Sequence, residues 1–232
     1  MSKRLVFAFM FMLPLATQAS CYSVVMLENA YASNVSFGGV TIPTESLRGL
    51  LITNARIDAE SGISTTLLLC DESVPNAFAG HKDGRNVVGI TVGMVKLLGN
   101  DWHAYAAVIG HENAHLVKNH GSKRQQREGV LALGRMILKS SLPQNAGVLA
   151  PTIVEYGIAG FSATYSQKEE SEADKLGMEF SHCAGFSADG ALSVHRKLDS
   201  ESGFFAIHPS SKLRIARLRV AIIAQQRNPD CR

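Results

Sequence analysis

The sequence is short of cysteine, of net charge and of long apolar runs, and each shortage argues against a class of protein. Its four cysteines include no Cys-x-x-Cys pair, which argues against a cysteine-based zinc site. The formal net charge is only +3, and no run of basic residues is interleaved with aromatic ones. Both features argue against a nucleic-acid partner. The sequence has no internal repeat and no low-complexity tract. With 46% hydrophobic residues it is long enough for one domain with a substantial core.

Residues 1–19 have the pattern of a secretory signal peptide. Lys3 and Arg4 form a positive start, residues 5–15 are apolar apart from Pro14, and Thr17-Gln18-Ala19 resembles a cleavage site. Cleavage would remove Lys3 and Arg4 and so lower the net charge from +3 to +1. We therefore predict an exported, periplasmic protein whose single domain occupies residues 20–232.

Cys21 follows the signal peptide directly and offers an alternative, a lipid anchor to the envelope membrane. Ala19 and Ser20 fit a lipidation signal, but Gln18 stands where a bulky apolar residue is wanted. Lipidation would also leave an odd number of free thiols, because an exported chain can form disulfides. The possible partner of a lipidated form is the outer membrane.

The cysteines at positions 21, 70, 183 and 231 allow three pairings. We expect Cys21 to pair with Cys70 and Cys183 with Cys231, since each bond would tie one end of the chain to the body. The sequence itself leaves the other pairings open.

The region 130–163 carries two apolar stretches, Val130–Leu138 and Gly147–Ala163. Neither reaches the roughly 18 uninterrupted apolar residues needed to span a bilayer. Arg135 and Glu155 also interrupt them. We expect a buried helical hairpin within the domain. The alternative is a lid or a membrane-touching hairpin over the functional cleft.

The most informative motif is His111-Glu112-Asn113-Ala114-His115, which reads HExxH inside the apolar, helix-favouring stretch Trp102–Val117. On a helix, residues four apart lie on one face, so His111 and His115 can bind one metal ion together. Glu112 stands beside them as a general base for a metal-activated water. The spacing predicts a zinc-dependent hydrolase.

A catalytic zinc ion takes three protein ligands, and a second acidic helix supplies the third. We predict this helix over residues 166–183. Glu170 and Asp174 are four apart and share a face, so Glu170 can bind the metal while Asp174 supports a zinc-bound histidine. We expect Glu169 and Glu172 to lie on the solvated surface, with Glu172 as the rival ligand.

Together these segments resemble metallopeptidase family 48, which includes the CAAX prenyl proteases and the HtpX-like and BepA-like bacterial proteases. The resemblance runs from about residue 67 to about residue 219 and includes Val74–Gly80, Tyr165–Glu170 and a late His208-Pro209. It implies a mainly helical α+β, zincin-like domain with a small β-sheet beside the HExxH helix. It also implies one Zn²⁺ per chain, held by His111, His115 and Glu170, with Glu112 catalytic.

His208 and Arg214 are candidates to stabilise the oxyanion of the substrate. His208 is also a candidate fourth zinc ligand that would hold the enzyme latent.

His120 lies five residues after His115. On a continuing helix this position points away from the zinc face, so we expect His120 to have a structural role. The remaining histidines have no partner at ligand spacing, and we expect surface or core positions for His81, His103, His182 and His195.

The predicted function is hydrolysis of peptide bonds in exported, unfolded or misfolded proteins. We expect the substrate to pair as an added strand along Asn86, Val87, Val88, Gly89 and Ile90. The alternative is a chaperone-like module that binds clients without cleaving them.

Beside the two motif helices, the pattern predicts strands at 64–70 and 86–90 and helices at 44–59, 91–98, 188–198 and 210–225.

Overall fold

The computed structural model describes residues 20–30, 33–37, 39–127, 165–198, 208, 212–227 and 231. The strands are β1 (Cys21–Ser23), β2 (Asn34–Phe37), β3 (Val40–Pro43), β4 (Thr65–Cys70), β5 (Ala77–Lys82) and β6 (Arg85–Thr91). The helices are α1 (Val24–Ala30), α2 (Thr44–Ser61), α3 (Val92–Leu98), α4 (Trp102–Val117), α7 (Gln167–Cys183), α8 (Gly190–Lys197) and α10 (Lys212–Arg227). Helices dominate, and the α+β class that we predicted is confirmed.

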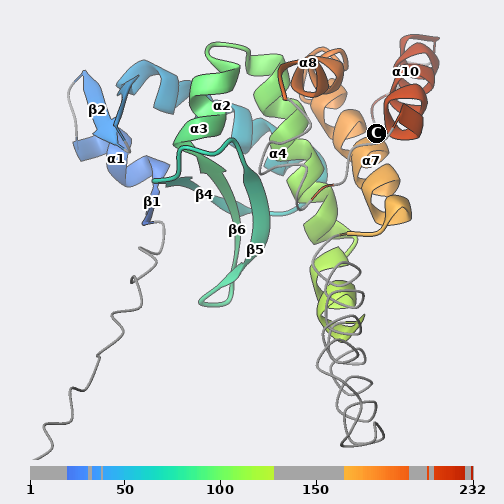
Figure 1. Cartoon of the computed structure of the whole chain (residues 1–232), viewed down its shortest axis with the longest axis horizontal. Coiled ribbons are helices and arrows are strands. Elements are labelled where there is room, and N and C mark those ends of the chain that lie inside the picture. Colours follow the sequence, from blue (N-terminus) through green and yellow to red (C-terminus); the bar gives the residue numbers. More distant parts are fainter. Residues whose placement is uncertain are drawn as a thin grey trace, which may run out of the picture.

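A four-stranded mixed sheet lies beside α4 in the order β1-β4-β6-β5 (Figure 1). The β4 and β6 strands are parallel, while β1 and β5 run antiparallel to their neighbours. A separate hairpin pairs β2 with β3. The β5 strand is thus the outer strand on the side of the sheet that faces away from β1.

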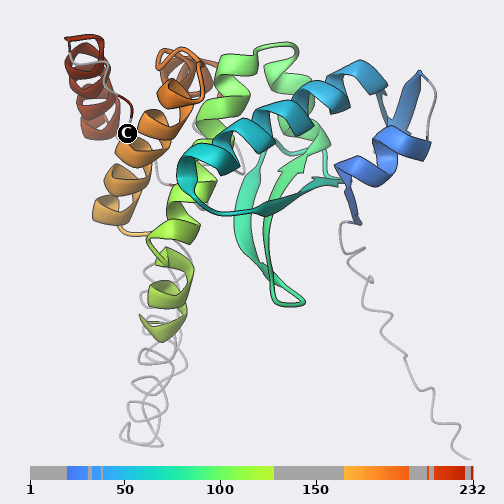
Figure 2. The same cartoon turned by 180° about the vertical axis from the view of Figure 1, so that it is seen from behind.

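Helix α4 forms the centre of the molecule. It contacts α2, α7, α8 and the strands β5 and β6. Seen from behind, the long helix α2 crosses over α4 and the sheet (Figure 2). From Ala104 to His115 every α4 residue is buried, which explains why this segment is apolar on all sides rather than on one stripe. The helix that carries the metal motif is therefore fixed from several directions.

Both expected disulfides are present, Cys21–Cys70 and Cys183–Cys231. The first bond lies on the register pair that joins β1 to β4, and the second links the last residue of α7 to the C-terminal segment. Since the Sγ atom of Cys21 is bonded to Cys70, it is not available to carry a thioether-linked lipid. The lipidation alternative therefore has no support.

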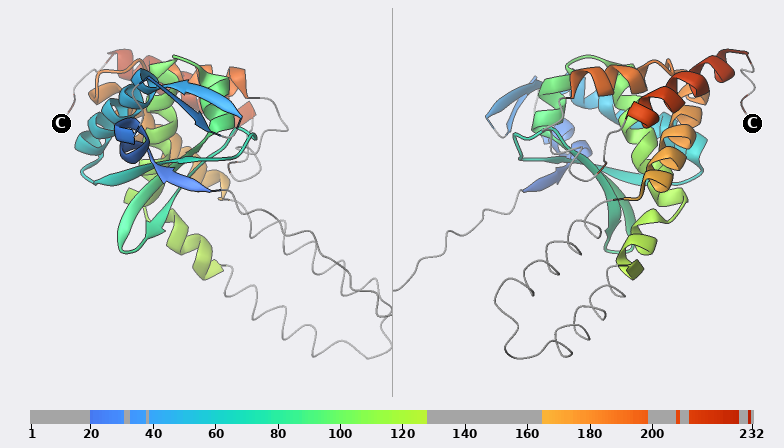
Figure 3. Two further views of the ribbon diagram at one scale, coloured as in Figure 1. Left: turned by 90° about the vertical axis from the view of Figure 1, so that its left-hand side faces the viewer. Right: turned by 45° about the vertical axis from the view of Figure 1, so that its right-hand side comes forward.

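Among the described residues, no helix has the length and apolar character needed to cross a membrane. The predicted signal peptide at 1–19 and the predicted hairpin at 130–163 lie outside the described residues. Helical residues 120–127 continue beyond α4 and project from the body in both further views (Figure 3).

Candidate metal centre

The α4 helix places His111, Glu112 and His115 in the interior. Asp101 caps its start, with the side chain accepting a hydrogen bond from the backbone N–H of Ala104 at 3.0 Å. The two histidines lie one turn apart, and their Nε2 atoms are 3.0 Å from each other. The imidazoles thus converge on one point, as the spacing predicts.

The α7 helix brings the carboxylates to that point. A capping box starts the helix: Ser166 Oγ accepts from the N–H of Glu169, and Glu169 accepts from the N–H of Ser166. Close approach of the two helices depends on glycine, because a Cβ atom on Gly177 would lie 2.5 Å from the backbone nitrogen of His111. A Cβ atom on Gly110 would likewise lie 2.5 Å from the carbonyl oxygen of Gly177. The glycine pair therefore sets the distance between the histidine helix and the glutamate helix.

Four side chains from three separate parts of the chain meet there: His111, His115, Glu170 and His208. Each offers one ligand atom, and these atoms all lie within 4.8 Å of one another. Glu170 Oε1 is 3.4 Å from His115 Nε2, and Glu170 Oε2 is 3.6 Å from His111 Nε2. His208 Nδ1 is 3.2 Å from His111 Nε2 and 3.1 Å from Glu170 Oε1. All four residues are buried.

Glu112 faces the same centre from the neighbouring position on α4. Its side chain is fully buried, and Oε1 lies 3.3 Å from Nε2 of His208. Burial raises the pKa of Glu112, although the nearby rings of His208 and His111 oppose the shift. A carboxylate with a raised pKa can both accept a proton and give it back, as a general base in hydrolysis must.

The outer nitrogen of His111 is held by Asp174, whose Oδ1 lies 3.1 Å from His111 Nδ1. This is the contact that the i, i+4 spacing of Glu170 and Asp174 predicts. Arg214 binds Asp174 through two hydrogen bonds of 2.8 and 2.7 Å. The same guanidinium lies 2.6 Å from Glu170 Oε2 and donates to the backbone oxygen of His208 at 3.2 Å.

The charges in this cluster shift the ionisation of its members. Burial alone would raise the pKa values of Glu170 and Asp174, but contacts with histidines and, for Asp174, with Arg214 hold both well below their usual range. Burial lowers the pKa of His115 to about 3. Burial would also lower the pKa of His111, yet its hydrogen bond to Asp174 raises it. Both carboxylates are therefore ionised at neutral pH and available as ligands or acceptors.

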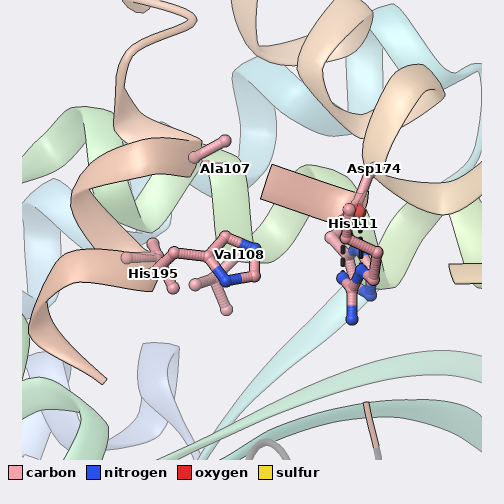
Figure 4. A pocket seen from close by; sticks show the side chains of 8 residues that line it. Ala107, Val108, His111, Asp174 and His195 are labelled. Atoms are coloured by element: carbon pink, nitrogen blue, oxygen red, sulfur yellow. Dashed lines mark hydrogen bonds and ion pairs between the residues drawn. The ribbon is translucent and has the colours of Figure 1, made fainter. Parts of the chain in front are cut away.

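His111 and Asp174 line a small cavity of about 30 Å³. Figure 4 shows the imidazole of His195 across this cavity from His111 and Asp174. Burial lowers the pKa of His195 to about 4, so its ring is neutral at physiological pH. His195 lies near the metal centre, which its sequence spacing did not indicate.

The prediction for the substrate strand is wrong. Asn86, Val87, Val88, Gly89 and Ile90 belong to β6, which lies between β4 and β5 and pairs with both. The ring of Phe78 occupies the space where a Cβ atom of Gly89 would be. This strand has no free edge for a peptide, and β5 is the strand at the edge of the described sheet.

Arg214, a candidate to stabilise the oxyanion, lies at the centre with its side chain engaged by protein groups. Its side chain is 1% exposed and its nitrogens bind Glu170, Asp174 and the His208 backbone. A guanidinium engaged in this way stabilises the carboxylates of Glu170 and Asp174. Glu169, expected at the surface, is buried because it caps α7 and forms an ion pair with Arg127 at 2.7 Å.

Two residues near the centre were missed or misplaced by sequence reasoning. Tyr165 stacks on the ring of His115 with centroids 3.9 Å apart, whereas the sequence marked it only as the first residue of the family-like segment Tyr165–Glu170. His120 does not point away: Nδ1 lies 3.0 Å from Nδ1 of His115. The α4 helix ends at Val117, and Asn119 has a positive φ of 54°, so helical spacing no longer applies.

Comparison with known proteins gives the same family. Residues 48–222 match peptidase family M48. The mitochondrial metalloendopeptidase OMA1 of Schizosaccharomyces pombe is 28% identical over 209 residues, 83% of this chain and 59% of that protein. OMA1 of Arabidopsis thaliana is 29% identical over 171 residues, 71% of this chain and 33% of that protein. The beta-barrel assembly-enhancing protease of Escherichia coli K12 is 28% identical over 128 residues, 49% of this chain and 26% of that protein.

This chain therefore spans about three fifths or less of the length of these relatives. The family match itself covers most of the chain, and it includes both the HExxH helix and the helix that carries Glu170 and Asp174. The chain belongs to peptidase family M48.

Proposed function

We propose that the protein is a zinc-dependent endopeptidase in which His111, His115 and Glu170 bind one Zn²⁺. Two imidazoles and a carboxylate are a donor set that catalytic zinc takes in other enzymes. Zinc bonds of about 2.0–2.1 Å in a tetrahedron require ligand atoms roughly 3.3 Å apart. The two imidazole Nε2 atoms are 3.0 Å apart, and the carboxylate of Glu170 lies 3.4 Å from His115 through Oε1 and 3.6 Å from His111 through Oε2. This convergence of two imidazoles and a carboxylate at near-tetrahedral spacing is the observation that carries the proposal.

Zinc, when bound, supplies a Lewis acid that polarises the peptide carbonyl and makes hydroxide available near neutral pH. The protein supplies the proton transfers and the orientation. Glu112 takes the proton of the attacking water and passes it to the leaving amine. Asp174 fixes the tautomer of His111 by accepting from Nδ1, so that Nε2 presents its lone pair to the metal. Arg214 holds Asp174 and Glu170 in place.

The substrate is an extended segment of an unfolded or misfolded protein, paired with the edge strand β5. A cleft of about 250 Å³ lies between this strand and the start of the helical residues 120–127. Ala79 and Gly80 of β5 line the cleft together with His115 and Tyr165. Main-chain pairing selects for extended backbone and places few demands on side chains. Such selectivity suits the clearance of misfolded proteins, a quality-control role.

The protein works outside the reducing cytosol, in the periplasm. All four cysteines are paired in disulfides, and disulfides persist in oxidising compartments. The sequence of residues 1–19 supports export, because a positive start is followed by an apolar segment and a cleavage-like site.

Metal analysis tests the zinc assignment directly. We expect one zinc per chain in the purified protein and none in His111→Ala. The matched control is His103→Ala, because His103 lies on the same helix but accepts a hydrogen bond from the Ser187 N–H outside the cluster. Zinc retained by His111→Ala, or lost equally by His103→Ala, would contradict the ligand set.

A second candidate function is a latent or client-binding state in which His208 fills the fourth zinc position. The position of its Nδ1, 3.1–3.2 Å from two of the proposed ligand atoms, favours this state. An occupied fourth position excludes the attacking water. In that case His208→Ala should cleave casein faster than the wild type while it keeps one zinc. If His208 instead stabilises the oxyanion, the same variant should lose activity by about 10²–10³.

A further inference from the structure

His120 is a buried polar residue that the mechanism does not use. Its side chain is fully buried, and its ring lies against that of His115 with centroids 5.0 Å apart. A buried imidazole is costly unless its nitrogens have partners. The turn at Asn119, with a left-handed φ of 54°, brings His120 back under the metal helix. A non-glycine residue in this region costs free energy, which the surrounding contacts have to offset.

With His115 as a zinc ligand, the contacts assign one proton to each ring. His115 faces the cluster with Nε2, so as a zinc ligand it carries its proton on Nδ1. That Nδ1–H can donate to Nδ1 of His120 at 3.0 Å. The proton of a neutral His120 is then on Nε2, which is buried and lies 3.4 Å from Oε2 of Glu172, within ion-pair distance but without the geometry of a hydrogen bond. The three side chains therefore form a chain from the helix surface to the metal centre.

We infer that His120 is a positioning residue that fixes the tautomer and orientation of His115, and that Glu172 in turn orients His120. His111 obtains the same support directly from Asp174 at 3.1 Å. On the His115 side, the neutral imidazole of His120 lies between the ring of His115 and the carboxylate of Glu172. His120 therefore transmits the effect of that carboxylate. The inference rests on the proposed zinc ligand set. It gives Glu172, which the sequence marked as a surface residue or rival ligand, a role in supporting a ligand.

Zinc affinity of purified variants, measured by competition with a chromophoric chelator, tests this role. Removing the partner of a metal-bound histidine commonly weakens metal binding by about 10–100-fold. We expect that loss in His120→Leu, which fills the space without an acceptor. His120→Asn places an amide oxygen close to the former Nδ1, so we expect its loss to be less than about tenfold. Thermal unfolding of the metal-free variants gives a readout of stability that is independent of zinc.

Glu172→Gln is the second variant, because its side chain is 44% exposed and its replacement leaves the core intact. We expect it to weaken zinc binding by up to about tenfold, and the matched control Glu179→Gln, at an exposed site on the same helix, to leave it unchanged. A structural role alone would lower the stability of metal-free His120→Leu and His120→Asn alike and leave zinc affinity at the wild-type value. That result would overturn the inference, as would equal affinity in Glu172→Gln and Glu179→Gln. Failure of the wild type to bind zinc would instead reject the proposed function.

Discussion

His111 and His115 lie one helical turn apart and both contact Glu170, yet Nδ1 of the first meets a carboxylate and Nδ1 of the second meets an imidazole. Asp174 and Arg214 hold the His111 side. Tyr165 and His120 hold the His115 side. The pKa shifts follow these surroundings: the carboxylate contact raises the pKa of His111, while burial lowers that of His115 to about 3. One helix can thus present two chemically identical ligands in different electrostatic environments, because separate elements supply their partners.

The largest expected effect comes from breaking the charged side with Arg214→Met. This change leaves the buried carboxylate of Glu170 and the largely buried carboxylate of Asp174 without their cation. Removing one partner of a buried ion pair costs about 3–5 kcal/mol. Urea unfolding of the metal-free protein measures the loss. Arg217→Met is the control, because its exposed side chain bonds only Ser171 among the contacts described, and we expect a change within about 0.5 kcal/mol. Equal stability of the two variants would show that charge does not hold the His111 side.

The spacing between the two motif helices gives the next largest effect. A methyl group added by Gly177→Ala would meet the backbone nitrogen of His111 at 2.5 Å, so we expect a loss of about 1–3 kcal/mol and weaker zinc binding. Gly121→Ala is the matched control, since nothing lies within 4 Å of its added Cβ and alanine favours the helix. If both variants bound zinc as the wild type does, the close approach of α4 and α7 would not set the site geometry.

The smallest effect concerns the ion pair that ties helical residues 120–127, which carry His120, to α7. Burial alone would raise the pKa of Glu169, but Arg127 and Ser166 lower it from 4.5 to about 2. A lowered pKa in the folded state stabilises the protein above pH 4.5, and this contribution disappears as the pH falls through about 2. Because the Arg127 side chain is 42% exposed, solvent screening reduces the contribution to about 1 kcal/mol.

We therefore expect Glu169→Gln to be less stable than the wild type at pH 7 and equally stable near pH 2. Unfolding curves across this range measure the difference. A difference that does not change with pH would show that capping alone, without the charge of Glu169, stabilises this side of the centre.

Local patterns in the sequence predicted the parts of the site that depend on one helix. The i, i+4 pairs His111/His115 and Glu170/Asp174 need only helical geometry, and both contacts are found as predicted. The predicted helix Trp102–Val117 has the same bounds as α4. Both disulfide pairings are confirmed as well.

Relations between distant elements were harder to predict. The position of β6 inside the sheet depends on β5, whose sequence Ala-Phe-Ala-Gly-His-Lys lacks the β-branched residues that mark a strand. The turn at Asn119 is a backbone feature that helical periodicity cannot anticipate. The target of Arg214 depends on how α10 lies against α7, which no spacing within α10 specifies.

The most direct test of the zinc peptidase assignment is zinc content together with casein cleavage, measured in parallel for the wild type and Glu112→Gln. Glu112 does not belong to the proposed ligand set, so its amide should leave metal binding intact and remove the general base, which is worth about 10²–10⁴ in rate. One zinc in both proteins, with cleavage reduced by that factor only in the variant, is the predicted result. A well-folded wild type without zinc, or equal cleavage by the two proteins, would contradict the assignment.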